Sequence, residues 1–327
     1  MSYSFFGTCS NDQAHFLKCL DSMIFQEILP KEIILVDSGD KNFKKEIQKR
    51  IKRKPIKLVY IFKKLSRVKA LNIALKKSTS EFSFRFDSRS RFSTSYAKKA
   101  LEILNKKSID AKVTGGSPTI INELNNFQSI LCTGLIQRPY VFFYPNHRRL
   151  GFSGYSSSVY LGCFDTKIIQ KIRYREVNSL ISEDSLIISD FLKNGYKTYI
   201  SSEISVSYIG RGSILKTIKL FTNYGYCRAG TILLTKNLFI SKRHFFTAIF
   251  LTTIFILLIG KSYSFIFLMP FLLLLINIFG EIFSVATKSS PKYPFFATIC
   301  QFAWIFGFIW RFLTIFNSNQ KSTNFLT

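Results

Sequence analysis

Residues 30–40 read PKEIILVDSGD, an apolar run that ends in an acidic turn. A short apolar run of this kind, preceded by Pro and followed by Asp and Gly, predicts a buried strand over residues 32–36 (EIILV). The preceding residues 12–26 carry apolar side chains at helical spacing, which predicts a helix. These side chains are Phe16, Leu17, Leu20, Met23 and Ile24.

The same pattern extends in both directions along the chain. It predicts alternating elements, with strands at residues 3–6, 57–62 and 82–86 and helices at residues 44–53 and 67–77. Alternation of this kind indicates an α/β fold with a parallel sheet covered by helices. Ligands of such sheets bind at the carboxyl ends of the strands, which is where Thr8, Asp37 and Asp87 fall.

The charge of the chain is strongly positive. Lys and Arg number 46 against 19 Asp and Glu, so the formal net charge is +27, while hydrophobic residues make up 47 %. That hydrophobic content excludes a disordered chain, and the charge indicates an anionic partner. Residues 41–69 are the densest basic stretch, which is either a solvated face or an attraction to anionic membrane lipids. No nucleic-acid-binding motif is present, so we expect no nucleic acid partner.

Only one carboxylate, Glu281, follows Glu203, and three apolar runs lie in this later part of the chain, at residues 245–260, 262–280 and 294–310. A membrane span needs about 20 apolar residues, and the runs predict about three transmembrane helices. The basic N-terminal part then faces the cytoplasm, which places a multi-pass protein in the inner (cytoplasmic) membrane. We therefore expect the following parts: a cytoplasmic domain 1–210, an amphipathic interfacial segment 211–241, a membrane domain 242–316 and a tail 317–327.

Several motifs follow one another along the chain, at residues 16–26, 30–37, 67–72 (RVKALN), 85–87 (RFD), 115–117 (GGS), 159–162 (VYLG), 183–186 (EDSL) and 194–197 (NGYK). In this order they resemble the motifs of family 2 glycosyltransferases, in particular the membrane-anchored exopolysaccharide (succinoglycan-type) subgroup. The resemblance covers roughly residues 3–235. It implies a glycosyltransferase-A fold and an inverting transfer from a nucleoside-diphosphate sugar, with a UDP-sugar favoured.

The resemblance also implies roles for individual residues. Asp184, beside Glu183, resembles the catalytic base; alternatively, both are acids that stabilise a helix N-terminus. Asp37 resembles the nucleoside-binding carboxylate, although an Asp in DSGD also forms turns. Thr8 and Arg67 fall in the donor-binding motifs.

Asp87 resembles the first acid of the DxD motif, which binds a divalent cation. The motif here reads Asp87-Ser-Arg89, and an arginine cannot bind a cation. Two alternatives follow: Mg²⁺ or Mn²⁺ still binds through Asp87 and the donor phosphates, or Arg89 contacts phosphate and partly replaces the ion.

The QxxRW motif of processive synthases is absent, which disfavours a polymer-extruding synthase. Tyr224 and Arg228 are candidates for the acceptor entrance, or members of an interfacial aromatic and basic belt.

The expected function is transfer of one sugar to a lipid-linked glycan acceptor in bacterial polysaccharide, capsule or O-antigen biosynthesis. One alternative is glycosylation of polyprenyl phosphate itself. The other is a non-catalytic membrane scaffold of a polysaccharide assembly complex.

Overall fold

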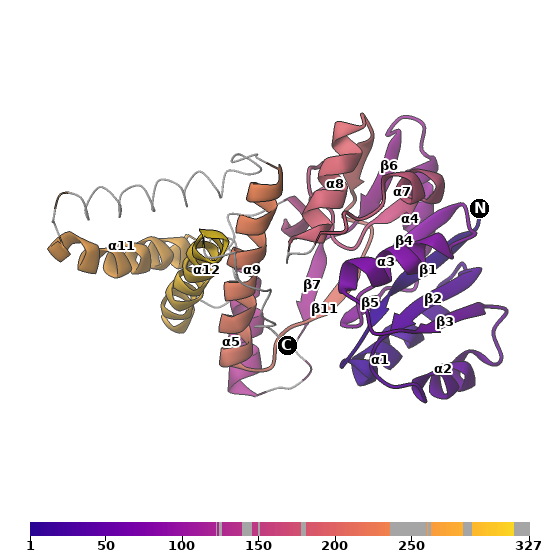
Figure 1. Ribbon diagram of the computed structural model, residues 1–327, viewed down its shortest axis with the longest axis horizontal. Coiled ribbons are helices and arrows are strands. Elements are labelled where there is room, and N and C mark those ends of the chain that lie inside the picture. The colour runs from indigo at the N-terminus through magenta and orange to yellow at the C-terminus, as the bar shows by residue number, and fades with distance from the viewer. Residues whose placement is uncertain are drawn as a thin grey trace. The chain divides into compact units, whose positions relative to one another are not determined.

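The computed structural model describes residues 1–121, 123, 126–138, 146–149, 151–177, 181–235, 260, 263–283 and 290–316 (Figure 1). The chain divides into two compact units. The first unit comprises residues 1–121, 145–177 and 183–209, and the second comprises residues 122–144, 178–182 and 210–327. The second unit thus includes a segment whose sequence lies between two parts of the first.

The first unit begins with four parallel strands in the order β3-β2-β1-β4. The strands are β1 (Tyr3–Cys9), β2 (Glu32–Asp37), β3 (Lys57–Phe62) and β4 (Phe82–Arg85). The connecting helices are α1 (Gln13–Ile24), α2 (Phe43–Ile51) and α3 (Arg67–Lys76). The strands and helices predicted for residues 3–86 are therefore confirmed, with boundaries shifted by at most three residues.

The sheet then becomes mixed. β9 (Cys163–Asp165) runs antiparallel to β4 and to β6 (Ala111–Gly115), β10 (Lys197–Ile200) is parallel to β6, and β8 (Gly154–Tyr155) completes the eight strands. A smaller sheet has the order β5-β11-β7. Its strands are β5 (Ser90–Phe92), β7 (Pro118–Ile121) and β11 (Val206–Ile209).

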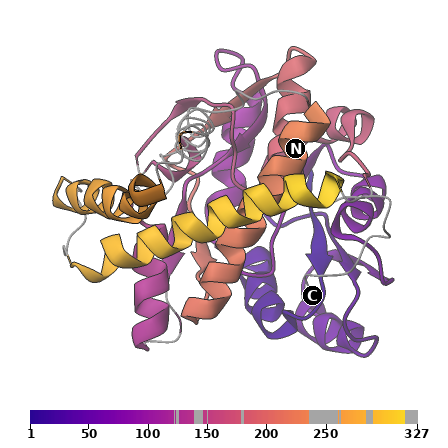
Figure 2. The ribbon, with the colours of Figure 1, turned by 60° about the vertical axis from the view of Figure 1, so that its left-hand side comes forward.

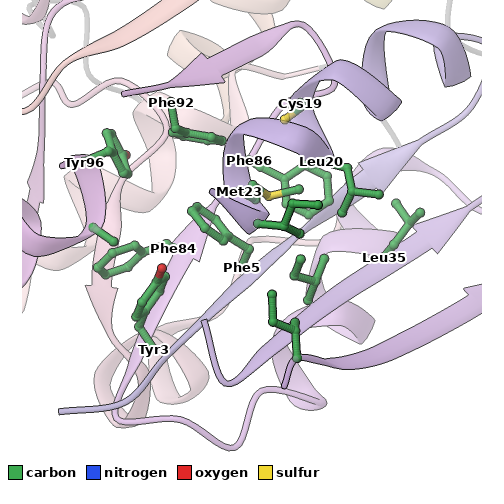
Figure 3. Close-up of a cluster of buried hydrophobic side chains, with 14 of the residues drawn as sticks. Tyr3, Phe5, Cys19, Leu20, Met23, Leu35, Phe84, Phe86, Phe92 and Tyr96 are labelled. Carbon is green, nitrogen blue, oxygen red and sulfur yellow. The ribbon is translucent and has the colours of Figure 1, made fainter. Parts of the chain in front are cut away.

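Helices cover both faces of the large sheet, which explains why a central strand such as β2 is buried throughout and reads as a nearly continuous apolar run. On one face, α1 and α4 (Tyr96–Asn105) pack against Phe5 and Phe84 (Figure 3). On the other face, α3, α7 (Thr166–Ile172) and α8 (Glu183–Lys193) pack against Phe6 and Phe164. Successive side chains of a strand point to opposite faces, so the neighbours Phe5 and Phe6 pack into different apolar clusters, one on each face of the sheet.

The strand order reverses at β1, since β2 lies on one side of it and β4 on the other. The loops that leave β1 and β4 therefore diverge, and a crevice opens at their carboxyl ends.

The second unit consists of helices that pack closely. α9 (Ile214–Thr235) and α12 (Lys292–Phe316) touch through their backbones, because a Cβ on Gly225 would lie 1.9 Å from the carbonyl oxygen of Trp304. Figure 2 shows α12 crossing α9 and α5 (Phe127–Ile136). All three helices contribute to one apolar cluster, whose members include Leu135, Phe221 and Phe296.

A charged pair is buried in this unit. Arg138, just after α5, donates from Nε and Nη2 to the two carboxylate oxygens of Glu281 at 2.7 and 2.9 Å. Glu281 belongs to α11 (Tyr263–Ile282), and both side chains are at most 5 % exposed. The guanidinium also lies 3.3 Å from the centre of the Tyr293 ring. Bidentate geometry offsets the cost of removing both charges from water.

Among the described residues, one helix is long and apolar enough to span a membrane, Lys292–Thr314 within α12. The apolar run 262–280 falls largely in α11. The run 245–260 lies, except for residue 260, outside the described residues, as do residues 236–241 of the interfacial segment and the tail 317–327. The expectation of about three spans is therefore not confirmed.

Phe84→Ala should lower the free energy of unfolding of the first unit by about 3–5 kcal/mol, because the deletion leaves a cavity in a closed aromatic cluster. The Phe84 ring centre lies 4.7 Å from that of Tyr3 and 6.3 Å from that of Tyr96. Urea denaturation of the full chain in detergent measures the change. The matched control is Phe25→Ala, since Phe25 is 61 % exposed; equal losses in the two variants would contradict the proposed core.

Candidate active site

A cavity of about 250 Å³ opens at the carboxyl ends of the first four strands. Its walls come from the end of β1, the segments after β2 and β3, the start of α3 and the end of β4. The polar and charged lining residues are Thr8, Ser10, Asp12, Ser38, Lys63, Arg67, Arg85, Asp87 and Ser88. Of the residues predicted for donor binding, Thr8, Arg67 and Asp87 line this cavity.

Two arginines connect the cavity to the acidic pair at the start of α8. Arg67 lies with Nη2 3.3 Å from Oδ2 of Asp87 and Nε 3.0 Å from Oε1 of Glu183. Arg85 donates from Nη2 to Oε1 of Glu183 at 3.1 Å and from Nη1 to Oδ1 of Asp184. The structure therefore brings together Asp87, Glu183 and Asp184, which are far apart in the sequence.

Arg85 is the member of this cluster that the sequence analysis missed. Its side chain is only 3 % exposed, and its guanidinium lies 5.5 Å from the centre of the Tyr174 ring. Among the described residues, neither its Nε nor the Tyr174 hydroxyl has a hydrogen-bond partner. The signal was present, because an arginine inside the buried run FSFRF needs a distant counter-charge.

The arginines control the ionisation of Asp184. Desolvation raises the pKa of this carboxyl, but the charges of Arg85 and Arg67 outweigh that effect and hold the pKa below its usual range. Asp184 is 60 % exposed and therefore accessible to a substrate. It is thus an ionised carboxylate at neutral pH, the protonation state that a base requires.

A thiol also lines the cavity. Burial, the largest cause, raises the pKa of Cys9 to about 12. The thiol stays protonated at neutral pH, so it does not act as a nucleophile.

Asp37 is fully buried at the end of β2. Its Oδ1 accepts from the Gly39 N–H at 2.9 Å, and its Oδ2 accepts from the Tyr60 hydroxyl at 2.7 Å. The neighbouring Ser38 lines the cavity, whereas Asp37 does not. The turn-forming role of Asp37 is thus visible, and its contact with a nucleoside stays a prediction.

The Asp87 region does not fit a divalent cation site. Oδ1 of Asp87 accepts from the Arg89 N–H at 3.0 Å, and Oδ2 faces Arg67. The Arg89 guanidinium is paired with Asp12, with Nη2 3.0 Å from Oδ1. In the part of the chain that the structure describes, no group of three or more His, Cys, Asp or Glu side chains is placed to hold a metal ion. The metal expected at Asp87 is not confirmed.

Tyr224 and Arg228 lie on α9, in the second unit. The hydroxyl of the nearby Tyr226 accepts from Nη1 of Arg311 at 2.8 Å, which joins α9 to α12. The role of Tyr224 and Arg228 at an acceptor entrance stays a prediction.

Comparison with known proteins defines the class of this site. Residues 7–158 match the model of Glycosyl transferase family 2. A Methanococcus voltae protein is 28 % identical over 233 residues, which are 66 % of this chain and 69 % of that protein. It is named dolichyl N-acetyl-α-D-glucosaminyl phosphate 3-β-D-2,3-diacetamido-2,3-dideoxy-β-D-glucuronosyltransferase.

Two solved structures are similar to this chain. Residues 1–349 of S. aureus TarS align at 18 % identity and a TM-score of 0.46, covering 71 % of this chain and 66 % of that one. The mannosyltransferase PcManGT of Pyrobaculum calidifontis, solved with GDP-Man and Mn²⁺, aligns at 11 % identity and a TM-score of 0.49, covering 98 % and 76 %. The chain thus spans just under two thirds of the TarS fragment.

Residues 7–158 therefore match a glycosyl transferase family 2 domain and lie in a mixed α/β fold, and the chain is a glycosyltransferase by its family and sequence matches. The expected enzyme class is confirmed, whereas the succinoglycan-type subgroup is not. The match ends at residue 158, before Glu183 and Asp184. Glu183 and Asp184 are linked to the matched region by their ion pairs with Arg67 and Arg85, which lie inside it.

The melting temperature of Asp184→Asn should differ from that of the natural chain in a pH-dependent way. Because the folded state lowers the Asp184 pKa, its stabilisation is present above the ordinary Asp pKa of about 4 and is lost as the pH falls through the lower folded value. The natural chain should therefore melt higher near neutral pH, and the difference should close in acid.

Differential scanning calorimetry of the full chain across this pH range measures the difference. In an Arg85→Met background, the pH-dependent part of the Asp184→Asn effect should shrink. A difference that stayed constant from neutral to acidic pH would contradict the assignment.

Proposed function

We propose that this glycosyltransferase moves one sugar from a nucleoside-diphosphate sugar to a lipid-linked glycan, with inversion at the anomeric carbon. One observation carries the proposal: Asp87, Glu183 and Asp184 gather around two arginines beside a cavity at the strand ends. Such a site offers cations to a diphosphate and an ionised carboxylate to an attacking hydroxyl. The first unit is the proposed catalytic domain.

The proposed reaction is a single displacement. An acceptor hydroxyl is a poor nucleophile at neutral pH, so Asp184 accepts its proton as the oxygen attacks the anomeric carbon. The bond between that carbon and the diphosphate oxygen breaks, and the nucleoside diphosphate leaves with the bonding electron pair. Glu183 forms ion pairs with both Arg67 and Arg85, and in this proposal it positions the two guanidinium groups.

The donor binds in the cavity. A UDP-sugar is the proposed donor, with Thr8 and the turn after β2 beside the nucleoside and Arg67 beside the phosphates. A direct contact from Asp37 to the base or ribose requires it to give up one present partner, Gly39 N–H or Tyr60. Asp87 positions Arg67 through its Oδ2.

A lipid-linked acceptor is supported by two observations. The relative from Methanococcus voltae is named for transfer to a dolichyl-phosphate-linked sugar, and α12 contains an apolar helix of spanning length. We place the protein at the inner membrane as a multi-pass chain, with its catalytic domain on the cytoplasmic side and its basic stretch near anionic lipids. The acceptor is then a glycan precursor of a bacterial polysaccharide, capsule or O-antigen, and Tyr224 and Arg228 are proposed to contact it.

Asp184→Asn should slow sugar transfer by about 10²–10⁴-fold, because the amide cannot accept the proton. Donor binding should remain, so the loss should fall on kcat. Turnover of labelled donor by the purified full chain, together with donor binding by calorimetry, measures both quantities. The control Asp110→Asn removes a 56 % exposed carboxylate outside the cavity lining and should keep full activity. Transfer by Asp184→Asn above a tenth of the natural rate would rule out Asp184 as the base.

The lipid product identifies the acceptor. Labelled donor given to the purified chain with a bacterial membrane lipid extract should place the new sugar on another sugar, as linkage analysis by mass spectrometry would show. A sugar attached directly to a lipid monophosphate would instead support the alternative, a polyprenyl-phosphate glycosyltransferase.

A further inference from the structure

The charges around the cavity nearly all pair with one another. Arg89 pairs with Asp12, Arg67 with Asp87 and Glu183, and Arg85 with Glu183 and Asp184. Lys63 also lines the cavity, and no carboxylate among the described residues is placed to pair with its ammonium group. The cluster thus contains four cations and four carboxylates, and one of the cations is unpaired.

Asp87, the residue expected to bind a divalent cation, already lies beside a positively charged arginine. Both Asp87 oxygens accept from arginine N–H groups, one from the Arg89 backbone and one from Arg67. A cation bound at Asp87 would therefore displace Arg67 and stand close to its guanidinium. Two like charges at such a distance repel each other, most strongly where water is excluded.

The arginine at position 89 also changes the charge balance. A carboxylate there would leave the cluster two charge units more negative, which is the charge of one divalent cation. With Arg89 in place, the cluster is balanced before any ion binds. A donor diphosphate then brings negative charge to a site that does not first need a metal to neutralise carboxylates.

We infer that Lys63 and Arg67 bind the donor diphosphate directly and neutralise its charge, so that donor binding needs no divalent cation. This inference rests on the proposed function, because it names what holds the diphosphate of the same donor. It also gives part of the basic stretch at residues 41–69 a ligand other than anionic lipid.

The two side chains are well placed for this task. Lys63 directly follows β3, and Arg67 is the first residue of α3, so they lie on either side of a short loop that lines the cavity. Arg67 is 52 % exposed, and Asp87 and Glu183 hold its guanidinium from two sides. Cations held in this way stabilise the leaving diphosphate without reorganisation during transfer.

The first α3 turn adds to the same effect. The N–H groups at the start of a helix lack acceptors within the helix, and the helix dipole favours an anion there. α3 has ten residues, and Arg67, Ala70 and Leu71 of its first turns line the cavity.

The first test measures binding of UDP, GDP, CDP and dTDP to the full chain in detergent by isothermal titration calorimetry. Each nucleotide is titrated once in EDTA and once in Mn²⁺. We expect one nucleotide to bind in EDTA with an affinity within about threefold of that in Mn²⁺. Binding that occurs only in Mn²⁺ and is lost in Asp87→Asn would overturn the inference and leave the proposed function intact. No binding of any nucleotide under either condition would overturn both.

The second test uses two adjacent lysines. Lys63→Ala should weaken binding of the nucleoside diphosphate in EDTA at least tenfold, whereas Lys64→Ala, outside the cavity lining, should change it by less than twofold. Binding of the corresponding nucleoside, which lacks phosphate, should be the same in both variants, so a folding defect would be recognised. Equal diphosphate affinity in Lys63→Ala and Lys64→Ala would contradict the role of Lys63.

Discussion

The buried guanidinium of Arg85 is the constraint on which the first unit depends. It lies at the end of a central strand and contacts two carboxylates that follow it by 98 and 99 residues. A charge that is 97 % removed from solvent is tolerated only if it is paired, and removing one partner of such a pair costs about 3–5 kcal/mol. The ion pairs of Arg85 therefore connect the parallel half of the sheet to the start of α8. They also hold Asp184 beside the cavity.

This arrangement gives the site a definite resting state. Each carboxylate of the cluster is bound to an arginine, so Asp184 is ionised but not free. Arg67 contacts Asp87, which follows β4, and Glu183 of α8, and its half-exposed side chain lines the cavity. A ligand that attracts Arg67 would loosen its hold on Glu183, and the charge around the acidic pair would change with it. In the proposed mechanism, donor binding and the strength of Asp184 as a base are thus electrostatically linked.

The sequence predicted the regular half of the fold because its strands are buried on both faces and bounded by turns, as in PKEIILVDSGD. It also predicted Thr8, Asp37 and Asp87 at the strand ends, and Thr8 and Asp87 line the cavity there, whereas Asp37 does not. Through the family resemblance it also indicated Arg67, which lines the cavity as well. It did not predict the pairing of Arg89 with Asp12 or of Arg85 with Glu183, since long-range ion pairs leave no periodic signal. The antiparallel β9 and the short β8 were missed for a similar reason, because two- and three-residue strands contain too few side chains to show alternation.

The pair Arg138–Glu281 has a consequence for the order in which the protein is made. Arg138 is synthesised 143 residues before the carboxylate that neutralises it, and the apolar residues of α12 that pack against α5 are synthesised later still. A ribosome that has completed the whole family 2 domain has thus not yet produced the partners of α5. A gene fragment that ends after β11 would permanently lack the Glu281 carboxylate that pairs with Arg138 and the α12 side chains that pack against α5, so a useful soluble fragment must also replace residues 122–144.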